Sequence, residues 1–323
     1  MSLFNVYPLY NVTPVKAKGL YVYDENNTEY LDLYGGHGVI SLGHTHPKYV
    51  DSITDQINKL GFYSNAIQNP LQKELADKLV TISCCKDYEL FLCNSGAEAN
   101  ENALKLASFK TGKKRVIAFK NGFHGRTSAA VAATDNKNII APINAQQEVT
   151  ILDLNDIESV KTELEKGDVC AVIVEFIQGV GGLDEATADF FEQVDKLCKA
   201  NNTCFIADEI QCGYGRSGKF FAFQNYNVIP DIISMAKGMG NGFPIGGILI
   251  HSNIEAKFGM LGTTFGGNHL ACAAGLSVLN VIEEEKLINN VNQVSTYFIK
   301  IAEKIPQIKN IKGRGLMLGL EFD

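Results

Sequence analysis

The sequence lacks three features that would point to other classes of protein: an excess of positive charge, paired cysteine motifs and long apolar runs. Its 323 residues include 36 acidic and 29 basic side chains, giving a net charge of −7. This balance argues against a basic patch of the kind that binds nucleic acid or an anionic membrane. We therefore expect no nucleic-acid and no membrane partner, and individual positive groups have to bind any small anionic substrate.

The chain contains cysteines, but their spacing is not typical of a disulfide framework. The chain has eight cysteines and no C-x-x-C, and several lie inside apolar segments. Such thiols are typical of a reduced, cytoplasmic protein rather than of a disulfide framework or a zinc site. His44 and His46 lie close in sequence, but no third ligand clusters with them. We therefore expect no metal centre and predict an ordinary loop pair.

Targeting segments and repeats are also missing. No lysine or arginine precedes Lys16, and the first residues have no uninterrupted apolar core, so we expect no secretory signal. No segment approaches the roughly 20 apolar residues of a membrane span. Internal repeats and low-complexity linkers are absent as well. The expected location is therefore the cytoplasm.

Helical patterns alternate with short apolar segments along most of the chain, of which 46% is hydrophobic. This alternation predicts an α/β fold: a mainly parallel sheet covered by helices on both faces, with ligands at the carboxyl ends of the strands. Seven strands are predicted, at residues 90–93, 116–119, 150–152, 169–176, 203–207, 232–235 and 247–250. The helices between them include residues 97–109 and 186–200.

The two ends of the chain predict a smaller α+β lobe. Residues 20–33 are typical of a hairpin with a polar turn, and the glycines around His37 predict a tight backbone approach. Helices ending near residues 282 and 305 and a strand at 319–322 are expected after residue 268. We therefore divide the chain into an N-terminal arm and hairpin (1–48), a large domain (49–266) and the start of a C-terminal small domain (267–323).

Two of the predicted strands end in an ionisable side chain, Asp208 and Lys237. A charge at the rim of a buried sheet is costly unless it has a use. An amine in such a place has a lowered pKa and can condense with an aldehyde, and a carboxylate can hold a ring nitrogen protonated. These are the two groups that pyridoxal phosphate requires from a protein. The alternative is a salt bridge that caps two adjacent strands.

Two loops that follow strands carry further candidate groups. Ser95, Gly96 and Ala97 open a helix directly after a strand, which is typical of a phosphate site and also of an ordinary helix cap. Phe123, flanked by Gly122 and a second glycine two residues on, can face a planar cofactor. Arg126 can bind a carboxylate through two hydrogen bonds. The alternative is a glycine-rich loop with a core phenylalanine and a surface arginine, and His124 is the weaker candidate for chemistry.

Three further segments complete the candidate groups. Residues 213–218 match G-x-G-x-x-G, but they do not directly follow a strand, so we expect no nucleotide there. Glu175, near a strand end beside loops that carry arginine, suggests an ion pair that orients an active-site group. Thr263 and Thr264 stand in a Thr-Thr-Phe-Gly-Gly run that is suited to a second phosphate clamp.

Taken in order, these motifs resemble those of class III pyridoxal-phosphate aminotransferases, and most of all the acetylornithine branch of that family. The resemblance rests on six runs: Asn-Ser-Gly-Ala-Glu-Ala-Asn (94–100), Phe-His-Gly-Arg-Thr (123–127), Asp-Glu-Ile-Gln (208–211), Gly-Tyr-Gly-Arg-Ser-Gly (213–218), Ala-Lys-Gly (236–238) and Thr-Thr-Phe-Gly-Gly-Asn (263–268). It covers essentially the whole chain. It implies a type I fold, pyridoxal 5′-phosphate as the cofactor and a homodimer.

The resemblance also implies individual roles. Lys237 would carry the cofactor as a Schiff base and move protons, and Asp208 would pair with the pyridine nitrogen. Gln211 would bind the cofactor's phenolic oxygen. The remaining implied roles are phosphate binding by Ser95, Gly96 and Ala97, ring stacking by Phe123, carboxylate binding by Arg126, substrate contacts by Glu175 and Thr263, and phosphate binding across the dimer by Thr264.

The chain departs from the family pattern at two places. Val180 stands where many relatives have a glutamate that pairs with a second carboxylate-binding arginine, and relatives continue beyond Asp323, so we expect the small domain to be incomplete. The expected activity is transamination of the terminal amine of acetylornithine or succinylornithine with 2-oxoglutarate, in arginine biosynthesis. The alternatives are an aminotransferase acting on ornithine or 4-aminobutyrate, a nucleotide-binding enzyme, and an inactive dimer partner.

Overall fold

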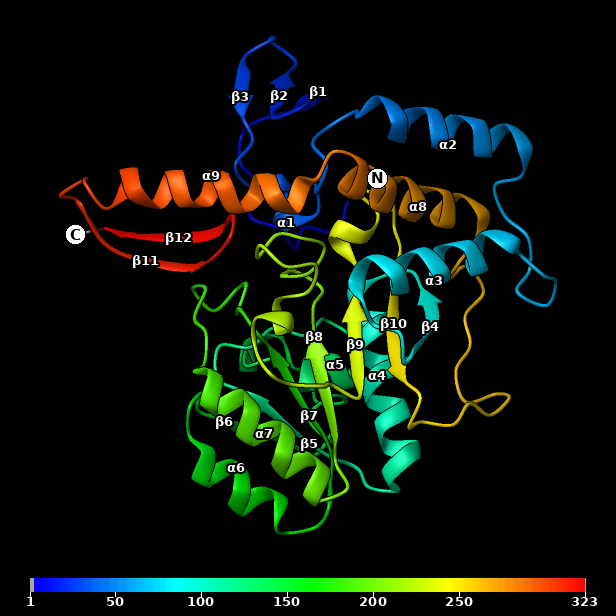
Figure 1. Cartoon of the computed structure of the whole chain (residues 1–323), viewed down its shortest axis with the longest axis vertical. Helices are drawn as coiled ribbons and strands as arrows, with labels where there is room; N and C mark the ends of the chain where they lie inside the picture. Colours follow the sequence, from blue (N-terminus) through cyan, green and yellow to red (C-terminus); the bar gives the residue numbers. More distant parts are fainter. Residues whose placement is uncertain (1–2, 323) are drawn as a thin grey trace.

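A single seven-stranded sheet forms the centre of the computed structural model, which describes residues 3–322 (Figure 1). In spatial order its strands are β4 (Tyr88–Cys93), β10 (Gly246–His251), β9 (Ile232–Met235), β8 (Cys204–Asp208), β7 (Val169–Glu175), β5 (Arg115–Phe119) and β6 (Val149–Leu152). The five strands from β9 to β6 pair in parallel, whereas β10 is antiparallel to both of its neighbours. The predicted mainly parallel sheet of seven strands is confirmed.

The antiparallel direction of β10 was not predicted, and it follows from the length of its connection. Only residues 236–245 link β9 to β10, and they contain one short 3-10 helix, η3 (Lys237–Met239). A parallel strand needs a crossover of about a dozen residues or more, so this short link turns the chain back. The link itself therefore stays at the carboxyl edge of the parallel strands.

Helices cover both faces of the sheet, as the alternation predicts. One face is covered by α4 (Gly96–Thr111), and the other by α3 (Pro70–Ser83), α6 (Ile157–Leu164), α7 (Ala188–Ala200) and α8 (His269–Glu284). Within β8, Cys204 and Ile206 join the core on the α4 side, and Phe205 and Ala207 join the opposite core. Because both faces are buried, the strand is continuously apolar instead of alternating.

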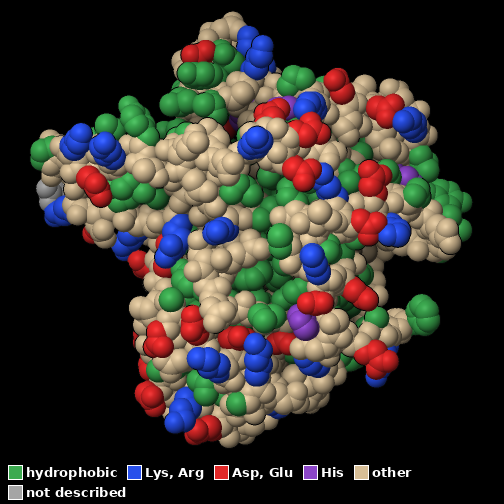
Figure 2. Space-filling model, in the orientation of Figure 1, with side chains coloured by type: hydrophobic (Ala, Val, Ile, Leu, Met, Phe, Trp, Pro, Cys, Tyr) green, Lys and Arg blue, Asp and Glu red, His purple; other side chains and the backbone are tan. Residues whose placement is uncertain are grey.

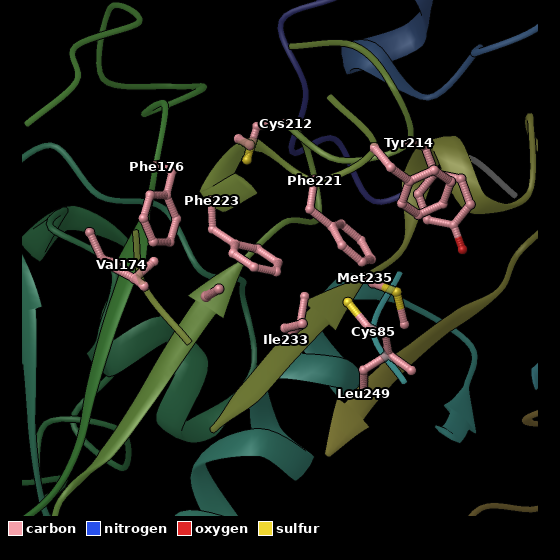
Figure 3. Close-up of a cluster of buried hydrophobic side chains, with 14 of the residues drawn as sticks. Cys85, Val174, Phe176, Cys212, Tyr214, Phe221, Phe223, Ile233, Met235 and Leu249 are labelled. Atoms are coloured by element: carbon pink, nitrogen blue, oxygen red, sulfur yellow. The ribbon is translucent and has the colours of Figure 1, made fainter. Parts of the chain in front are cut away.

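An aromatic cluster fixes the long loop that follows β8. Phe221 and Phe223 have ring centroids 5.7 Å apart, and Phe223 lies 6.2 Å from Phe176 at the end of β7. Figure 3 shows these rings over the ends of the central strands, with Tyr214 beside Phe221. The 3-10 helix η2 (Ala222–Asn225) lies within the same loop. The cluster therefore holds the loop against the edge of the sheet where Asp208 lies.

The remaining elements lie around this large unit. The sheet of β1 (Pro14–Lys18), β2 (Tyr21–Asp24) and β3 (Glu29–Leu31) projects at the top of Figure 1, while α9 (Leu287–Ala302) and the hairpin of β11 (Ile308–Arg314) and β12 (Met317–Phe322) project to the left. The other elements are α1 (Gly35–Gly38), α2 (Pro47–Lys59), α5 (Ser128–Ala132) and η1 (Lys137–Ile139). Strands β1 and β11 were not predicted, because their side chains are mostly exposed or half-buried and show no clear apolar alternation.

Exposed apolar side chains gather on the three-stranded sheet, at the top of Figure 2. They include Val15, Leu20 and Leu31, which are 62%, 63% and 53% exposed.

Within residues 3–322, no helix is both long enough and apolar enough to cross a membrane.

Candidate active site

A cavity of about 360 Å³ lies at the carboxyl edge of the parallel strands. Nine of the eleven candidate residues line it: Ser95, Gly96, Ala97, Phe123, Arg126, Glu175, Asp208, Gln211 and Lys237. They come from the ends of β4, β5, β7, β8 and β9, which the sheet brings to one edge. Ligands in open α/β sheets bind at this edge. Val39 and Val180 line the same cavity.

Asp208 lies at the end of β8, is 2% exposed and is bound by two other buried side chains. Its Oδ2 atom lies 2.7 Å from Nδ1 of His124 and accepts a hydrogen bond of 2.7 Å from the Asn100 amide. The backbone N–H of Ile210 donates to Oδ1 at 3.1 Å. Burial alone would lower the pKa of His124, but the hydrogen bond and the charge of Asp208 outweigh burial and raise it. These contacts hold the Asp208 carboxylate in a fixed position at the wall of the cavity.

Glu175 is the neighbour of Asp208 across β7 and β8 and is also buried. Burial raises the pKa of its carboxyl to about 7, and the charge of Asp208 adds to this effect. Its two oxygens accept backbone hydrogen bonds from Phe123 (2.8 Å) and Gly179 (3.0 Å). The sequence suggested an ion pair between Glu175 and an arginine. Within residues 3–322 Glu175 forms no such pair, so this prediction is wrong. The carboxylate instead fixes two loops at the cavity wall.

Lys237 follows β9 and has a left-handed backbone, with φ of 44°. Its amine has no hydrogen-bond or ion-pair partner within residues 3–322. Burial lowers the pKa of this amine, whereas the carboxylates of Asp208 and Glu175 oppose the lowering. The alternative of a salt bridge between Lys237 and Asp208 is not formed, because His124 and Asn100 occupy the carboxylate. The cavity thus contains an unpaired, partly desolvated amine.

Ser95 is the N-cap of α4, and its hydroxyl accepts a hydrogen bond of 3.2 Å from the N–H of Glu98. The ordinary cap is therefore present. It uses one N–H of the first turn, and the N–H groups of Gly96 and Ala97 precede the first intrahelical bond and line the cavity. A Cβ on Gly96 would lie 2.8 Å from a methyl group of Ile210, so glycine is required for this close approach. Cap and anion site are compatible at this helix end.

Gln211 lines the cavity, and Gly179 lies against its side chain. Gln211 donates to the carbonyl of His37 at 3.2 Å, across 174 residues of chain. A Cβ on Gly179 would lie 1.4 Å from Oε1 of Gln211. The Gln211 side chain therefore depends on a glycine at position 179 for its place.

Two candidates do not line the cavity. Thr263 accepts from the N–H of Gly266 at 3.1 Å and from the Asn94 amide at 3.3 Å, and Thr264 is exposed. The structure thus separates both threonines from the cavity of their own chain.

The structure also shows the two segments that were not expected to bind a nucleotide or a metal. The G-x-G-x-x-G run at 213–218 forms turns and does not open a helix, as a dinucleotide site requires. His44 contacts Asp32 at 2.8 Å and His46 contacts Glu285 at 3.1 Å, so the two rings face different carboxylates. In the part of the chain that the structure describes, no three ligand-type side chains meet around a possible metal position.

Comparison with known proteins identifies the family. Residues 5–323 match the family of class-III aminotransferases. The chain belongs to this family. It is 42% identical to an acetylornithine aminotransferase of Aquifex aeolicus (99% of this chain, 86% of the relative) and 41% identical to a succinylornithine transaminase of Photorhabdus laumondii (96% and 80%). The crystal structure of the ornithine aminotransferase from Toxoplasma gondii ME49 superposes with a TM-score of 0.90 at 30% identity (98% and 78%).

Class III aminotransferases use pyridoxal 5′-phosphate, and the residues present in this aminotransferase fit that cofactor. The unpaired amine of Lys237 is free to bind an aldehyde. The Asp208 carboxylate is buried and held in place, and the start of α4 offers N–H groups to a phosphate. These three observations concern separate parts of one cavity, so they support the fit independently.

Sequence reasoning underrated one residue of this aminotransferase and missed two. His124 was the weaker candidate and Asn100 was not singled out, yet both bind Asp208. Little in the sequence marks them, because Asn100 stands beside Glu98 and Glu101, and His124 lies in a glycine-rich loop. Glu209 was missed altogether: it is fully buried, accepts from the N–H groups of Ala222 (2.8 Å) and Phe223 (2.7 Å), and burial raises its pKa to about 7.

Proposed function

We propose that this enzyme transfers the terminal amino group of an N-acylornithine to 2-oxoglutarate, as a step of arginine biosynthesis. The observation that carries the proposal is that one cavity holds the unpaired amine of Lys237, the fixed carboxylate of Asp208 and the exposed guanidinium of Arg126. Relatives named acetylornithine aminotransferase, about 40% identical over nearly the whole chain, support this choice of substrate.

In the proposed reaction each side chain has one task. When bound, pyridoxal phosphate supplies the aldehyde that takes up the amino group and the ring that stores an electron pair. Lys237 anchors the cofactor and carries the proton at the substrate carbon, and Asp208 holds the ring nitrogen protonated. Arg126 binds the substrate's α-carboxylate, and Phe123 stacks on the ring. The phosphate is bound by Ser95, Gly96 and Ala97, and Gln211 binds the phenolic oxygen.

We further propose that the enzyme is a homodimer. Thr264 is exposed and lies outside the cavity of its own chain, which supports a role for it at the phosphate site of the neighbouring subunit. Thr263 and Glu175 contribute to substrate binding through the loops that they fix. The eight free thiols, seven of them buried, support a cytoplasmic location.

Val180 bears on the choice of acyl group. It lines the cavity and is 66% exposed, so it presents an apolar surface at the cavity mouth. A glutamate at this place would repel a second substrate carboxylate, and valine does not. We therefore propose that the enzyme accepts N-succinylornithine at least as well as N-acetylornithine.

The test is a comparison of kcat/KM for the two acylornithines and for ornithine and 4-aminobutyrate, which are the substrates of the alternative aminotransferases. Val180→Glu is expected to lower the succinyl-to-acetyl ratio about tenfold, since about 1.4 kcal/mol of repulsion corresponds to a factor of 10. The neutral, similarly sized Val180→Gln is the matched control and should leave the ratio near that of the wild type. An unchanged ratio in Val180→Glu contradicts the role of Val180, and a wild type that prefers ornithine contradicts the proposed substrate.

A further inference from the structure

Another cavity, of about 100 Å³, lies beside the loop at 213–218. Tyr214 and Arg216 line it from this loop, Ser41 from the N-terminal segment, and the first turn of α9 from the opposite side. No acidic side chain lines it within the described residues. Its polar side chains are those of Ser41, Tyr214 and Arg216, and its remaining side chains are apolar.

Arg216 brings an uncompensated positive charge to this cavity. Its Nη2 donates to the carbonyl of Gly38 at 2.7 Å, but its Nε is buried without a hydrogen-bond partner. The guanidinium pairs with no carboxylate of residues 3–322. The residue is half-buried, and a partly desolvated cation of this kind is unfavourable unless a negative charge compensates for it.

Tyr214 supplies a second unsatisfied donor. The residue is 5% exposed, and its hydroxyl is buried without a partner. Figure 3 shows the ring at the margin of the aromatic cluster, beside Phe221. Buried hydroxyl groups in folded proteins nearly always have a partner, so this one is available to a water molecule or a small ligand.

The start of α9 supplies a third positive element. The helix begins after Lys286 without a side-chain cap and has no acidic residue in its first turn. Leu287 and Ile288 of that turn line the cavity. The first N–H groups of a helix lack intrahelical partners and carry a partial positive charge. This helix end therefore adds to the field of Arg216.

We propose that this cavity is a binding site for a small monovalent anion of the size of chloride, held between the guanidinium of Arg216, the hydroxyl of Tyr214 and the first turn of α9. The size agrees, because about 100 Å³ holds such an ion with one or two water molecules at about 30 Å³ each. An acylornithine or a phosphorylated cofactor does not fit this volume. The site is separate from the catalytic cavity and does not depend on the proposed substrate.

The anion is coupled to the catalytic lysine through the backbone and through charge. Ser41, which lines the cavity, donates to the carbonyl of Gly238 at 2.8 Å, directly after Lys237. Burial lowers the pKa of Lys237; Asp208, Glu175 and Cys212 oppose this, and the charge of Arg216 adds to it. An anion beside Arg216 offsets that last contribution. Chloride is therefore expected to raise the pH at which the visible absorption of the bound cofactor titrates.

The experiment uses the holoenzyme in 0–100 mM sodium chloride, with sodium gluconate keeping the ionic strength constant. Binding with a Kd of about 1 mM is expected to raise Tm by roughly 4 °C over this range and to shift the titration of the cofactor absorption upward. Arg216→Gln should remove both responses. Lys219→Gln, which removes an exposed positive charge from the same loop, is the matched control and should retain them.

A cavity-filling variant keeps the test decisive if Arg216→Gln does not fold. Val291→Phe narrows the cavity and leaves the arginine in place, so it should also abolish the chloride response. Crystals of the holoenzyme soaked in sodium bromide should show anomalous scattering beside Arg216. A chloride response that persists in Arg216→Gln or Val291→Phe arises at another cation, such as Arg126, and overturns the proposal. So does a soaked crystal in which the cavity holds only water.

Discussion

Replacement of Glu175 by glutamine tests the electrostatics at the centre of the site. Burial raises the pKa of this carboxyl from 4.5 to about 7. The folded chain therefore holds the proton more tightly than the unfolded chain does, and the wild type loses stability as the pH rises from 4.5 to 7. The difference between the two pKa values corresponds to about 3 kcal/mol of unfolding free energy.

Glu175→Gln does not titrate, so this loss is absent in the variant. Glutamine can accept one of the two backbone hydrogen bonds, from Phe123 or Gly179, and the other is lost at a cost of about 1 kcal/mol at every pH. The variant is therefore expected to be less stable than the wild type at pH 5 and more stable at pH 8. The two curves of unfolding free energy against pH therefore cross, which shows that burial destabilises the charged form of the carboxyl group.

Urea unfolding of the apoenzyme at several pH values measures this difference. Far-UV circular dichroism is the appropriate probe, because the chain contains no tryptophan. Glu165→Gln, at an exposed position, is the control and should follow the wild type at each pH. A stability difference between Glu175→Gln and the wild type that stays constant from pH 5 to pH 8 would refute the reasoning.

Three further substitutions test the assigned roles. Lys237→Ala should abolish transamination and leave the circular dichroism spectrum intact. Borohydride reduction of the wild-type holoenzyme should attach the cofactor to Lys237, and an adduct on another lysine contradicts the assignment. Asp208→Asn should retain cofactor but lower kcat by roughly three orders of magnitude, since an amide cannot hold the ring nitrogen protonated, and near-normal turnover would make Asp208 merely structural. Gly179→Ala should displace the flexible Gln211 side chain and weaken cofactor affinity about tenfold, as Gln211→Ala should, with the Tm of the apoenzyme nearly unchanged. A normal affinity in both variants argues against a role for Gln211.

The sequence predicted those parts of the fold that depend on local pattern. All seven sheet strands were found from their short apolar runs, which are continuous where both faces are buried, as in β8. The direction of β10 was missed, since it depends on the length of a link and not on the pattern of the strand. Strands β1 and β11 were missed because mostly exposed strands carry little apolar signal.

The site was predictable to the extent that each residue stands next to a strand end. Asp208 and Lys237 met this condition, and adjacent parallel strands bring them to one edge. The contact between His124 and Asp208 spans 84 residues, and no spacing rule predicts it. The ion pair expected for Glu175 was wrong for a similar reason, since its true partners are backbone N–H groups that leave no trace in the side-chain sequence. The domain boundaries at residues 48 and 266 stay a prediction.

The catalytic cavity draws its walls from Val39 to Ile245, on five strand ends and the N-terminal segment. No shorter stretch of nascent chain contains every lining residue, so the cofactor can meet the complete site only after Ile245 has been synthesised. Cofactor binding is thus a late step in the synthesis and folding of the chain. Through mass action, a cell rich in pyridoxal phosphate would also keep more of this chain folded and out of reach of proteases than a starved one.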